Sequence, residues 1–284
     1  MVAQIDSHHH FWRYNPEEYS WIDDSMALLR RDFLPEDLRP EIQRAGIDGV
    51  ISVQARQNLE ETRWLLALAA NHSFIRGVVG WVPLTDIKLP QVLQSLAGNE
   101  KLKSIRHVLQ GEPDDRYMLR SDFNRGIDLL QEFNLAYDIL IFERHLPYVL
   151  EFVKQHPQQV FVLDHVAKPR IRDRIVSPWR ENVRELAKFP NVYCKISGMV
   201  TEAGYTTWKE EDLAPYFDTV LEAFGPSRLL FGSDWPVCLV AASYGSWLAL
   251  VKRQIAMLTD SEQSAILGGT AARVYRIDTV GDKE

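Results

Sequence analysis

Cysteine is scarce in this chain of 284 residues: there are two, Cys194 and Cys238, and they form no Cys-x-x-Cys pair. Both lie in apolar runs, so neither a disulfide scaffold nor a zinc ribbon is expected. No stretch approaches the roughly 18 consecutive apolar residues of a membrane span. The N-terminus also lacks the basic and apolar segments of a secretory signal. We therefore expect a cytoplasmic protein without a membrane partner.

Positive charge is also limited. Lys and Arg number 32 against 39 Asp and Glu, which gives a formal net charge of −7 and argues against a broad nucleic-acid surface. The sequence has no GxGxxG, P-loop, GxSxG or HExxH motif. Its composition, 46% hydrophobic and 25% charged, is that of a globular protein and excludes disorder and coiled coil. A small-molecule partner is expected, and no pattern indicates an oligomeric state.

Short apolar segments alternate with amphipathic stretches along the whole chain. Eight such segments are predicted strands, at 4–8, 49–54, 77–82, 104–108, 136–141, 160–165, 192–197 and 229–233. Their starts are about 32 residues apart, which is the size of one strand plus one return helix. The pattern predicts an α/β fold, a (β/α)8 TIM barrel, with 1–284 as one domain. A doubly wound open sheet is the alternative, because periodicity does not show whether the sheet closes.

Polar residues end several of these strands, where the active sites of barrels lie. The first strand runs into His8, His9 and His10. Since strand side chains alternate in direction, His8 and His10 face one side and His9 the other. Two converging imidazoles suit a divalent metal, zinc among others. The alternatives are a solvated strand end or the remnant of an expression tag.

The sixth and eighth predicted strands end in similar residues. His165 closes the sixth, and alone it would more often be a buried histidine with satisfied hydrogen bonds. Asp234 follows the eighth, and a buried carboxylate needs a cation, a histidine or a role in proton transfer. Three histidines and one aspartate at the ends of three strands together indicate a site.

Six segments carry a resemblance to a known family: 5–12, 105–107, 163–169, 195–198, 231–236 and 268–275. Together they resemble the amidohydrolase superfamily, and more narrowly its TIM-barrel lactone hydrolases, which include L-fuconolactonase and L-rhamnonolactonase. The resemblance covers nearly the whole chain. It implies a carboxylic-ester hydrolase that opens the lactone ring of a sugar acid, such as L-fuconolactone or L-rhamnonolactone.

The resemblance also implies roles for the residues at the strand ends. His8, His10 and His165 would form the catalytic site, and Asp234 would be the general base that takes a proton from water and returns it to the departing ring hydroxyl. The same four residues would hold one divalent metal, zinc or manganese. Strands four and five lack the usual ligands of a second metal. The family branch includes members without any ion, so metal dependence stays open.

Further strand-end residues are candidates for substrate binding. Arg106, His107 and Lys195 would hold sugar hydroxyls or polarise the carbonyl, although an ion pair in the barrel mouth would equally explain Arg106 and Lys195. Apolar ring faces for a sugar could come from three tryptophans, which more often pack against loops: Trp12, Trp81 and Trp235. The loops at 21–31 and 110–116 are expected to form the rim of the pocket.

Three other functions stay open at this point. The first is a metal-dependent decarboxylase of the same superfamily, and the second is a lactonase for non-sugar rings such as a muconolactone or a pyrone. The third is a catalytically inactive barrel that acts as a binding protein. The presence of His8, His10, His165 and Asp234 together speaks against the third.

Overall fold

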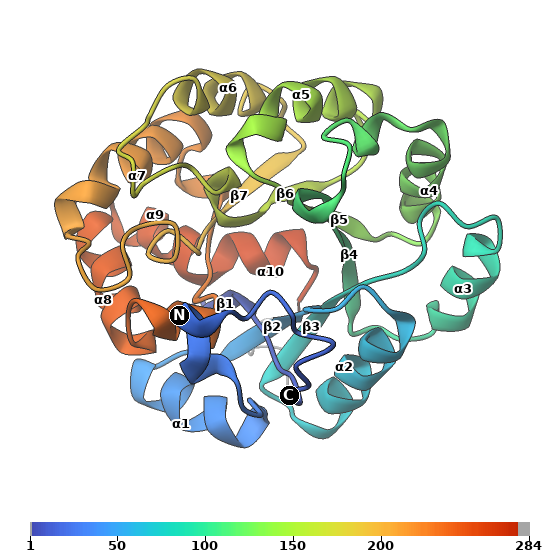
Figure 1. Cartoon of the computed structure of the whole chain (residues 1–284), viewed down its shortest axis with the longest axis horizontal. Coiled ribbons are helices and arrows are strands. Elements are labelled where there is room, and N and C mark those ends of the chain that lie inside the picture. Colours follow the sequence, from blue (N-terminus) through green and yellow to red (C-terminus); the bar gives the residue numbers. More distant parts are fainter. Residues whose placement is uncertain (1, 278–284) are drawn as a thin grey trace.

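The computed structural model describes residues 2–277. Eight parallel strands pair in chain order, each with the next, and helices lie outside them (Figure 1). The strands are β1 (Ile5–His9), β2 (Gly49–Val53), β3 (Ile75–Gly80), β4 (Leu102–Val108), β5 (Ala136–Leu140), β6 (Phe161–Leu163), β7 (Val192–Ile196) and β8 (Leu229–Phe231). Eight strands at the predicted positions confirm the α/β expectation.

The first and last strands meet, and this decides between a barrel and an open sheet. His9 pairs with Trp235 in a parallel bridge. The His10 N–H donates to the Trp235 carbonyl at 2.7 Å, and the Asp234 N–H donates to the His8 carbonyl at 2.8 Å. The sheet therefore closes into a (β/α)8 barrel, and the open-sheet alternative is excluded.

The return helices each bury one apolar stripe against the strands, as helices that cover a parallel sheet must. They are α1 (Pro35–Ala45), α2 (Leu59–Asn71), α3 (Leu89–Leu96), α4 (Ser121–Glu132), α5 (Leu146–Gln155), α6 (Trp179–Leu186), α7 (Glu210–Phe224) and α8 (Tyr244–Gln254). Two short helices follow, α9 (Asp260–Ser264) and α10 (Thr270–Val274). Across residues 2–277, no helix combines the length and the apolar character needed to cross a membrane.

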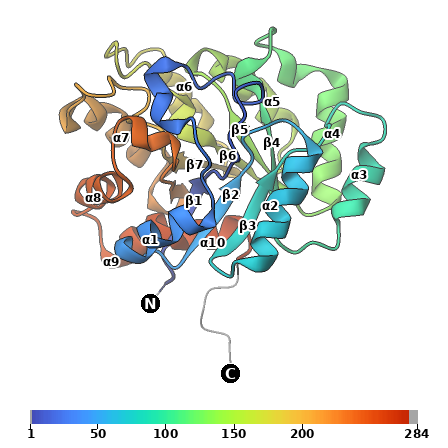
Figure 2. The same ribbon diagram turned by 60° about the horizontal axis from the view of Figure 1, so that its bottom comes forward.

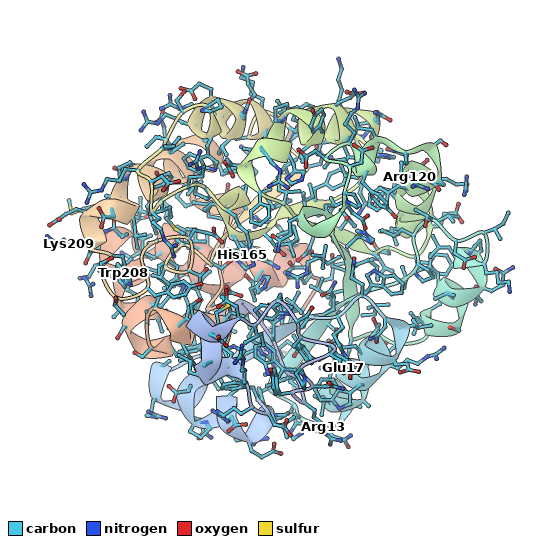
Figure 3. All side chains as sticks on the ribbon, in the orientation of Figure 1. Arg13, Glu17, Arg120, His165, Trp208 and Lys209 are labelled. Carbon is cyan, nitrogen blue, oxygen red and sulfur yellow. The ribbon has the colours of Figure 1, made fainter. Side chains whose placement is uncertain are left out.

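The interior of the barrel changes from apolar to charged along its axis. Near the strand starts, inward side chains such as Ile5, Ile51 and Leu230 form a cluster with Val274 and Tyr275. Helix α10 crosses this end of the barrel (Figure 2). Nearer the strand ends the interior is polar, so the apolar layer supports the charged residues above it. His165 lies near the centre of the ring of helices, whereas Arg120 and Lys209 lie at its periphery (Figure 3).

Glu61 connects the first turn of α2 to the loop that follows β2. Its side chain is fully buried and accepts the N–H groups of Ala55 at 2.9 Å and Arg56 at 2.7 Å. Burial raises the pKa of Glu61 to about 7, because the two N–H groups and the Arg56 charge only partly offset the loss of water. Glu61 thereby fixes Ala55, which lines the cavity described below.

This burial predicts a pH dependence of stability. A carboxyl group whose folded pKa is raised favours folding below its unfolded pKa, near 4.5, and this contribution is lost as pH rises through about 7. Glu61→Gln keeps the acceptor oxygen without the titration. As the pH rises from 5 to 8, we expect the parent to lose up to about 2–3 kcal/mol of its free energy of unfolding relative to Glu61→Gln. Urea unfolding measures this, with the exposed Glu60→Gln as control. If the difference in free energy of unfolding between Glu61→Gln and the parent were the same at pH 5 and pH 8, the raised pKa of Glu61 would be contradicted.

Candidate active site

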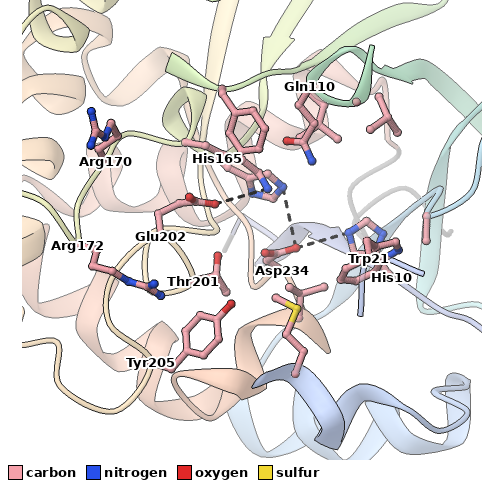
Figure 4. Close-up of a pocket in the computed structure, with 18 of the residues that line it drawn as sticks. His10, Trp21, Gln110, His165, Arg170, Arg172, Thr201, Glu202, Tyr205 and Asp234 are labelled. Carbon is pink, nitrogen blue, oxygen red and sulfur yellow. Dashed lines mark ion pairs between the residues drawn. The ribbon is translucent and has the colours of Figure 1, made fainter. Parts of the chain in front are cut away.

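Three imidazoles and one carboxylate converge at the carboxyl end of the barrel, and Figure 4 shows His10, His165 and Asp234 among them. His8 in β1 and His10, just after this strand, point inward, with their Nε2 atoms 3.2 Å apart. Asp234 Oδ1, just after β8, lies 3.8 Å from His8 Nε2 and 3.5 Å from His10 Nε2. It lies 4.0 Å from Nε2 of His165, which follows β6. His9 faces away and contacts the Ser52 hydroxyl at 2.9 Å, as strand alternation predicts.

Hydrogen bonds on the far side of the rings fix how the imidazoles face the site. His10 Nδ1 lies 2.9 Å from the Val53 carbonyl oxygen. Because a carbonyl only accepts, Nδ1 carries the proton in the neutral ring and the Nε2 lone pair faces Asp234. His165 Nδ1 lies 2.9 Å from the Ser197 hydroxyl. Such partners orient metal-ligating histidines in proteins.

The backbone at two of these residues lies in the left-handed region. Asp234 has φ 58°, and the four residues from His165 to Lys168 have φ between 47° and 63°. Left-handed backbone costs non-glycine residues roughly 1–2 kcal/mol each. Two hydrogen bonds stabilise this left-handed turn: the Trp179 indole donates to the Val166 carbonyl at 2.7 Å, and the Lys168 N–H donates to the His165 carbonyl at 2.8 Å. Strand β6 therefore ends at Leu163, two residues earlier than predicted.

A buried charge network lies beneath the imidazoles. The Lys195 ammonium lies 2.5 Å from Asp138 Oδ2, 3.0 Å from Asp164 Oδ1 and 3.2 Å from His8 Nδ1. Arg106 Nη1 donates to Asp164 Oδ2 at 2.9 Å. The ion pairs considered for Arg106 and Lys195 thus exist. Arg106 also lines the cavity above, whereas Lys195 is fully buried below it.

The protonation states suit a cation-binding or base-catalysed site. Burial lowers the pKa of His165 to about 4, and burial together with the Lys195 charge lowers the pKa of His8 far below 6.5. Burial raises the pKa of Asp234, but His165, His10 and Lys168 together outweigh it and hold this pKa below its usual range. At neutral pH the site therefore holds a carboxylate beside two neutral imidazoles, His8 and His165.

The donor set fits one divalent ion. Four ligands bound at about 2.1 Å around a tetrahedral centre are roughly 3.4 Å apart, and the separations among His8, His10 and Asp234 are 3.2 to 3.8 Å. His8 and His165 also approach Asp164. That carboxylate is already neutralised by Arg106 and Lys195, whose charges oppose a second cation there.

A cavity of about 730 Å³ opens above this cluster. His10, His165, Asp234 and Arg106 form part of its wall. Its rim comes from the two loops predicted for it, through Trp21 and Met26 on one side and Gln110 and Gly111 on the other. The remaining lining residues are Ala55, Val108, Leu140, Phe142, Lys168, Arg170, Arg172, Asp173, Thr201, Glu202, Tyr205 and Val237. A volume of this size holds a small molecule.

Five of the six predicted substrate-binding residues are absent from the described lining of the cavity: the buried Lys195, His107 and the three tryptophans. His107 turns to the other face of β4, where it contacts Glu112 at 2.6 Å and stacks on Tyr117. The three tryptophans pack or bond within the protein, as their apolar rings favour. Trp12 is fully buried against Phe33 and Tyr19, Trp235 packs against Phe11 and Phe33, and Trp81 bonds through its backbone to Thr62.

Several lining residues were missed by reasoning from the sequence. Lys168 stands three residues after His165, and its position depends on the left-handed turn, which has no glycine to signal it. Glu202 and Tyr205 lie in the loop after β7, which shows no apolar periodicity. Their position in the sequence could have indicated them, because each residue lies shortly after a strand that already carried a candidate residue.

Comparisons with known proteins agree with this geometry. The family model described as Amidohydrolase matches residues 5–277. An L-fucono-1,5-lactonase of Burkholderia multivorans is 43% identical over 99% of this chain and 98% of that protein. Another, from Burkholderia ambifaria, is 38% identical over 98% of this chain and 97% of that protein. A crystal structure of an amidohydrolase from Burkholderia multivorans with bound zinc has a TM-score of 0.95 and 43% identity, and the match covers 98% of this chain and 100% of that one.

Gly198, just after β7, gives a test of the cluster. It has φ +63°, and a Cβ there would lie 2.5 Å from His165 Nδ1. We expect Gly198→Ala to displace the ring, weaken Zn²⁺ binding at least tenfold in calorimetry and destabilise the fold by roughly 1–3 kcal/mol. Gly46→Ala is the control, because Gly46 has φ +70° and its Cβ would meet nothing within 4 Å. Equal Zn²⁺ affinity in both variants would contradict this role of Gly198.

Proposed function

The chain belongs to the amidohydrolase family, and on this premise we propose that it hydrolyses the lactone of a sugar acid, with L-fuconolactone as the first candidate and L-rhamnonolactone as the next. The proposal assigns the activity to one domain that spans 1–284. The observation that carries it is the Asp234 carboxylate, placed within 4.0 Å of three imidazole Nε2 atoms at the floor of the cavity.

Asp234 acts as the general base in this proposal. A water molecule between the carboxylate and the lactone carbonyl gives its proton to Asp234 while its oxygen attacks the carbonyl carbon. The carbonyl oxygen becomes anionic during the attack and needs a positive or donating partner. A divalent ion, when bound by His8, His10, His165 and Asp234, supplies that partner as a Lewis acid. The zinc reported for the similar amidohydrolase structure supports zinc as the first ion to test.

The cavity supports a polyhydroxylated substrate. Arg106, Thr201, Tyr205 and Gln110 bring side-chain donors or acceptors to its wall, and Leu140 adds an apolar contact. Polar groups that bond each hydroxyl reject analogues that lack it more strongly than an apolar wall does. The proposed substrate is taken as a free small molecule. A cytoplasmic location stays a prediction.

The first test is a hydrolysis screen with a pH indicator, over sugar lactones and non-sugar lactones. We expect acid release from six-carbon or 6-deoxy sugar lactones. Asp234→Asn should lower kcat by about 10²- to 10⁴-fold, the usual contribution of a general base, while the exposed Asp86→Asn keeps the parent rate. Release of carbon dioxide from aromatic acids would instead indicate a decarboxylase, activity restricted to pyrones a non-sugar lactonase, and binding without turnover an inactive barrel.

Metal dependence is tested on the same protein after exhaustive chelation. Because His8, His10 and Asp234 are spaced as ligands of one ion, we expect about one zinc or manganese per chain in the active protein. Chelation should remove the ion and the activity together, and zinc or manganese should restore both, as measured by metal analysis and initial rates. A metal-free protein with the full rate would show that the imidazoles polarise the carbonyl without an ion.

A further inference from the structure

We propose that the Lys168 ammonium gives the proton to the ring oxygen of the lactone as the ring opens, and that Glu202 is a positioning residue for this ammonium. The inference deepens the proposed function and rests on it. It assigns the leaving-group proton to a second side chain of the cavity lining, so Asp234 need not return its proton directly.

The backbone places Lys168 in the site. The left-handed turn from His165 to Lys168 projects both side chains into the cavity wall, three residues apart. A right-handed helical path after β6 would carry the chain elsewhere. The turn therefore fixes Lys168 together with His165, which faces Asp234.

Lys168 and Glu202 form a largely buried pair. The Lys168 Nζ lies 3.5 Å from Glu202 Oε1, and their side chains are 20% and 23% exposed. Figure 4 shows the Glu202 carboxylate directed to the side of the cavity where His165 lies. An ammonium group has three N–H donors. Glu202 occupies one side of it, which leaves donors for a substrate oxygen.

The pKa values of the neighbouring groups agree with the placement of Lys168 in the cavity wall. Burial raises the pKa of Glu202, and the Lys168 charge offsets only part of the rise. The same Lys168 charge helps to hold the pKa of Asp234 and of His165 down. The Lys168 charge therefore acts on both Asp234 and its neighbouring imidazole, His165.

The other cations of the described cavity lining are unsuited to the task. Arg106 is bonded to Asp164 and Gln54, and Arg170 to Asp173. Arg172 donates to the Ala203 carbonyl at 3.3 Å. A guanidinium also keeps its protons in proteins, whereas an ammonium can release one. Lys168 is the lining cation that combines a releasable proton with an orientation toward the cluster.

The proton balance closes over one turnover. Water oxygen bonds to the carbonyl carbon and its proton moves to Asp234. When the bond between this carbon and the ring oxygen breaks, the electron pair stays on the ring oxygen, which takes a proton from Lys168. The neutral Lys168 amine then receives the proton held by Asp234. Lactone and water have become a hydroxy acid, and both side chains are restored.

The leaving group of the substrate tests this assignment. An alkoxide ring oxygen needs a proton to leave, whereas the phenolate of dihydrocoumarin, with a pKa of about 10 for its phenol, needs little help. We expect Lys168→Met to lower kcat on the sugar lactone by about 10²- to 10⁴-fold and on dihydrocoumarin by less than tenfold. Glu202→Gln should show the same selectivity with a smaller loss. Lys188→Met, on the surface at the end of α6, is the control.

A chemical rescue separates catalysis from folding. Lys168→Cys, alkylated to an aminoethyl thioether, regains an ammonium of lower pKa. Burial raises the pKa of Cys194 and Cys238 far above that of an exposed thiol, so these two resist alkylation. We expect the rate of sugar-lactone hydrolysis to return, and the alkaline limb of its pH–rate profile to lie at lower pH than in the parent. Equal losses on both substrates, or a rescue without that shift, would overturn the role of Lys168 and leave the proposed function intact. Absence of all lactonase activity in the parent would overturn both.

Discussion

The site depends on one buried carboxylate, Asp164, held between two cations. Lys195 and Arg106 approach its two oxygens at 3.0 and 2.9 Å, and His8 Nδ1 lies 3.4 Å away. Burial alone would raise the pKa of Asp164, but these neighbours, Lys195 first, hold it well below its usual range. Removal of one member would leave uncompensated charge in the interior, which costs several kcal/mol. The network thus joins β1, β4, β6 and β7 at one level of the barrel.

This charged layer lies between the apolar end of the barrel and the imidazole cluster. The Tyr275 hydroxyl, just after α10, donates to Asp138 Oδ2 at 2.8 Å, and Asp138 pairs with Lys195. The end of the described chain is therefore bonded to the layer on which the imidazoles rest. Above it, the neutral rings of His8 and His165 lie beside an ionised Asp234. The order of layers, from apolar to paired charge to reactive groups, keeps water out of the ion network while leaving the site open to substrate.

The sequence predicted what depends on strand periodicity and missed what depends on irregular backbone. The alternation of side chains along residues 8–10 was enough to predict that His8 and His10 face inward. The apolar runs were enough to locate all eight strands. The same rule shows why His107 faces away from Arg106, its neighbour on β4. Lys168 enters the cavity through a turn that L-amino acids rarely adopt, so local preferences argued against it. The three tryptophans lie outside the described cavity lining, and the burial of Trp12 and Trp235 depends on packing between distant segments, such as Trp12 on Phe33.

The bridge between His9 and Trp235 has a consequence for biosynthesis. Asp234, the proposed base, and two of the three imidazoles come from the ends of the first and last strands, so the candidate site joins segments from opposite ends of the chain. Such distant pairings close late in folding, because nearly the whole chain must be ordered before they form. A ribosome-bound chain that has not yet emerged as far as Asp234 would expose His8 and His10 without their carboxylate. The candidate site is thus complete only when the barrel closes.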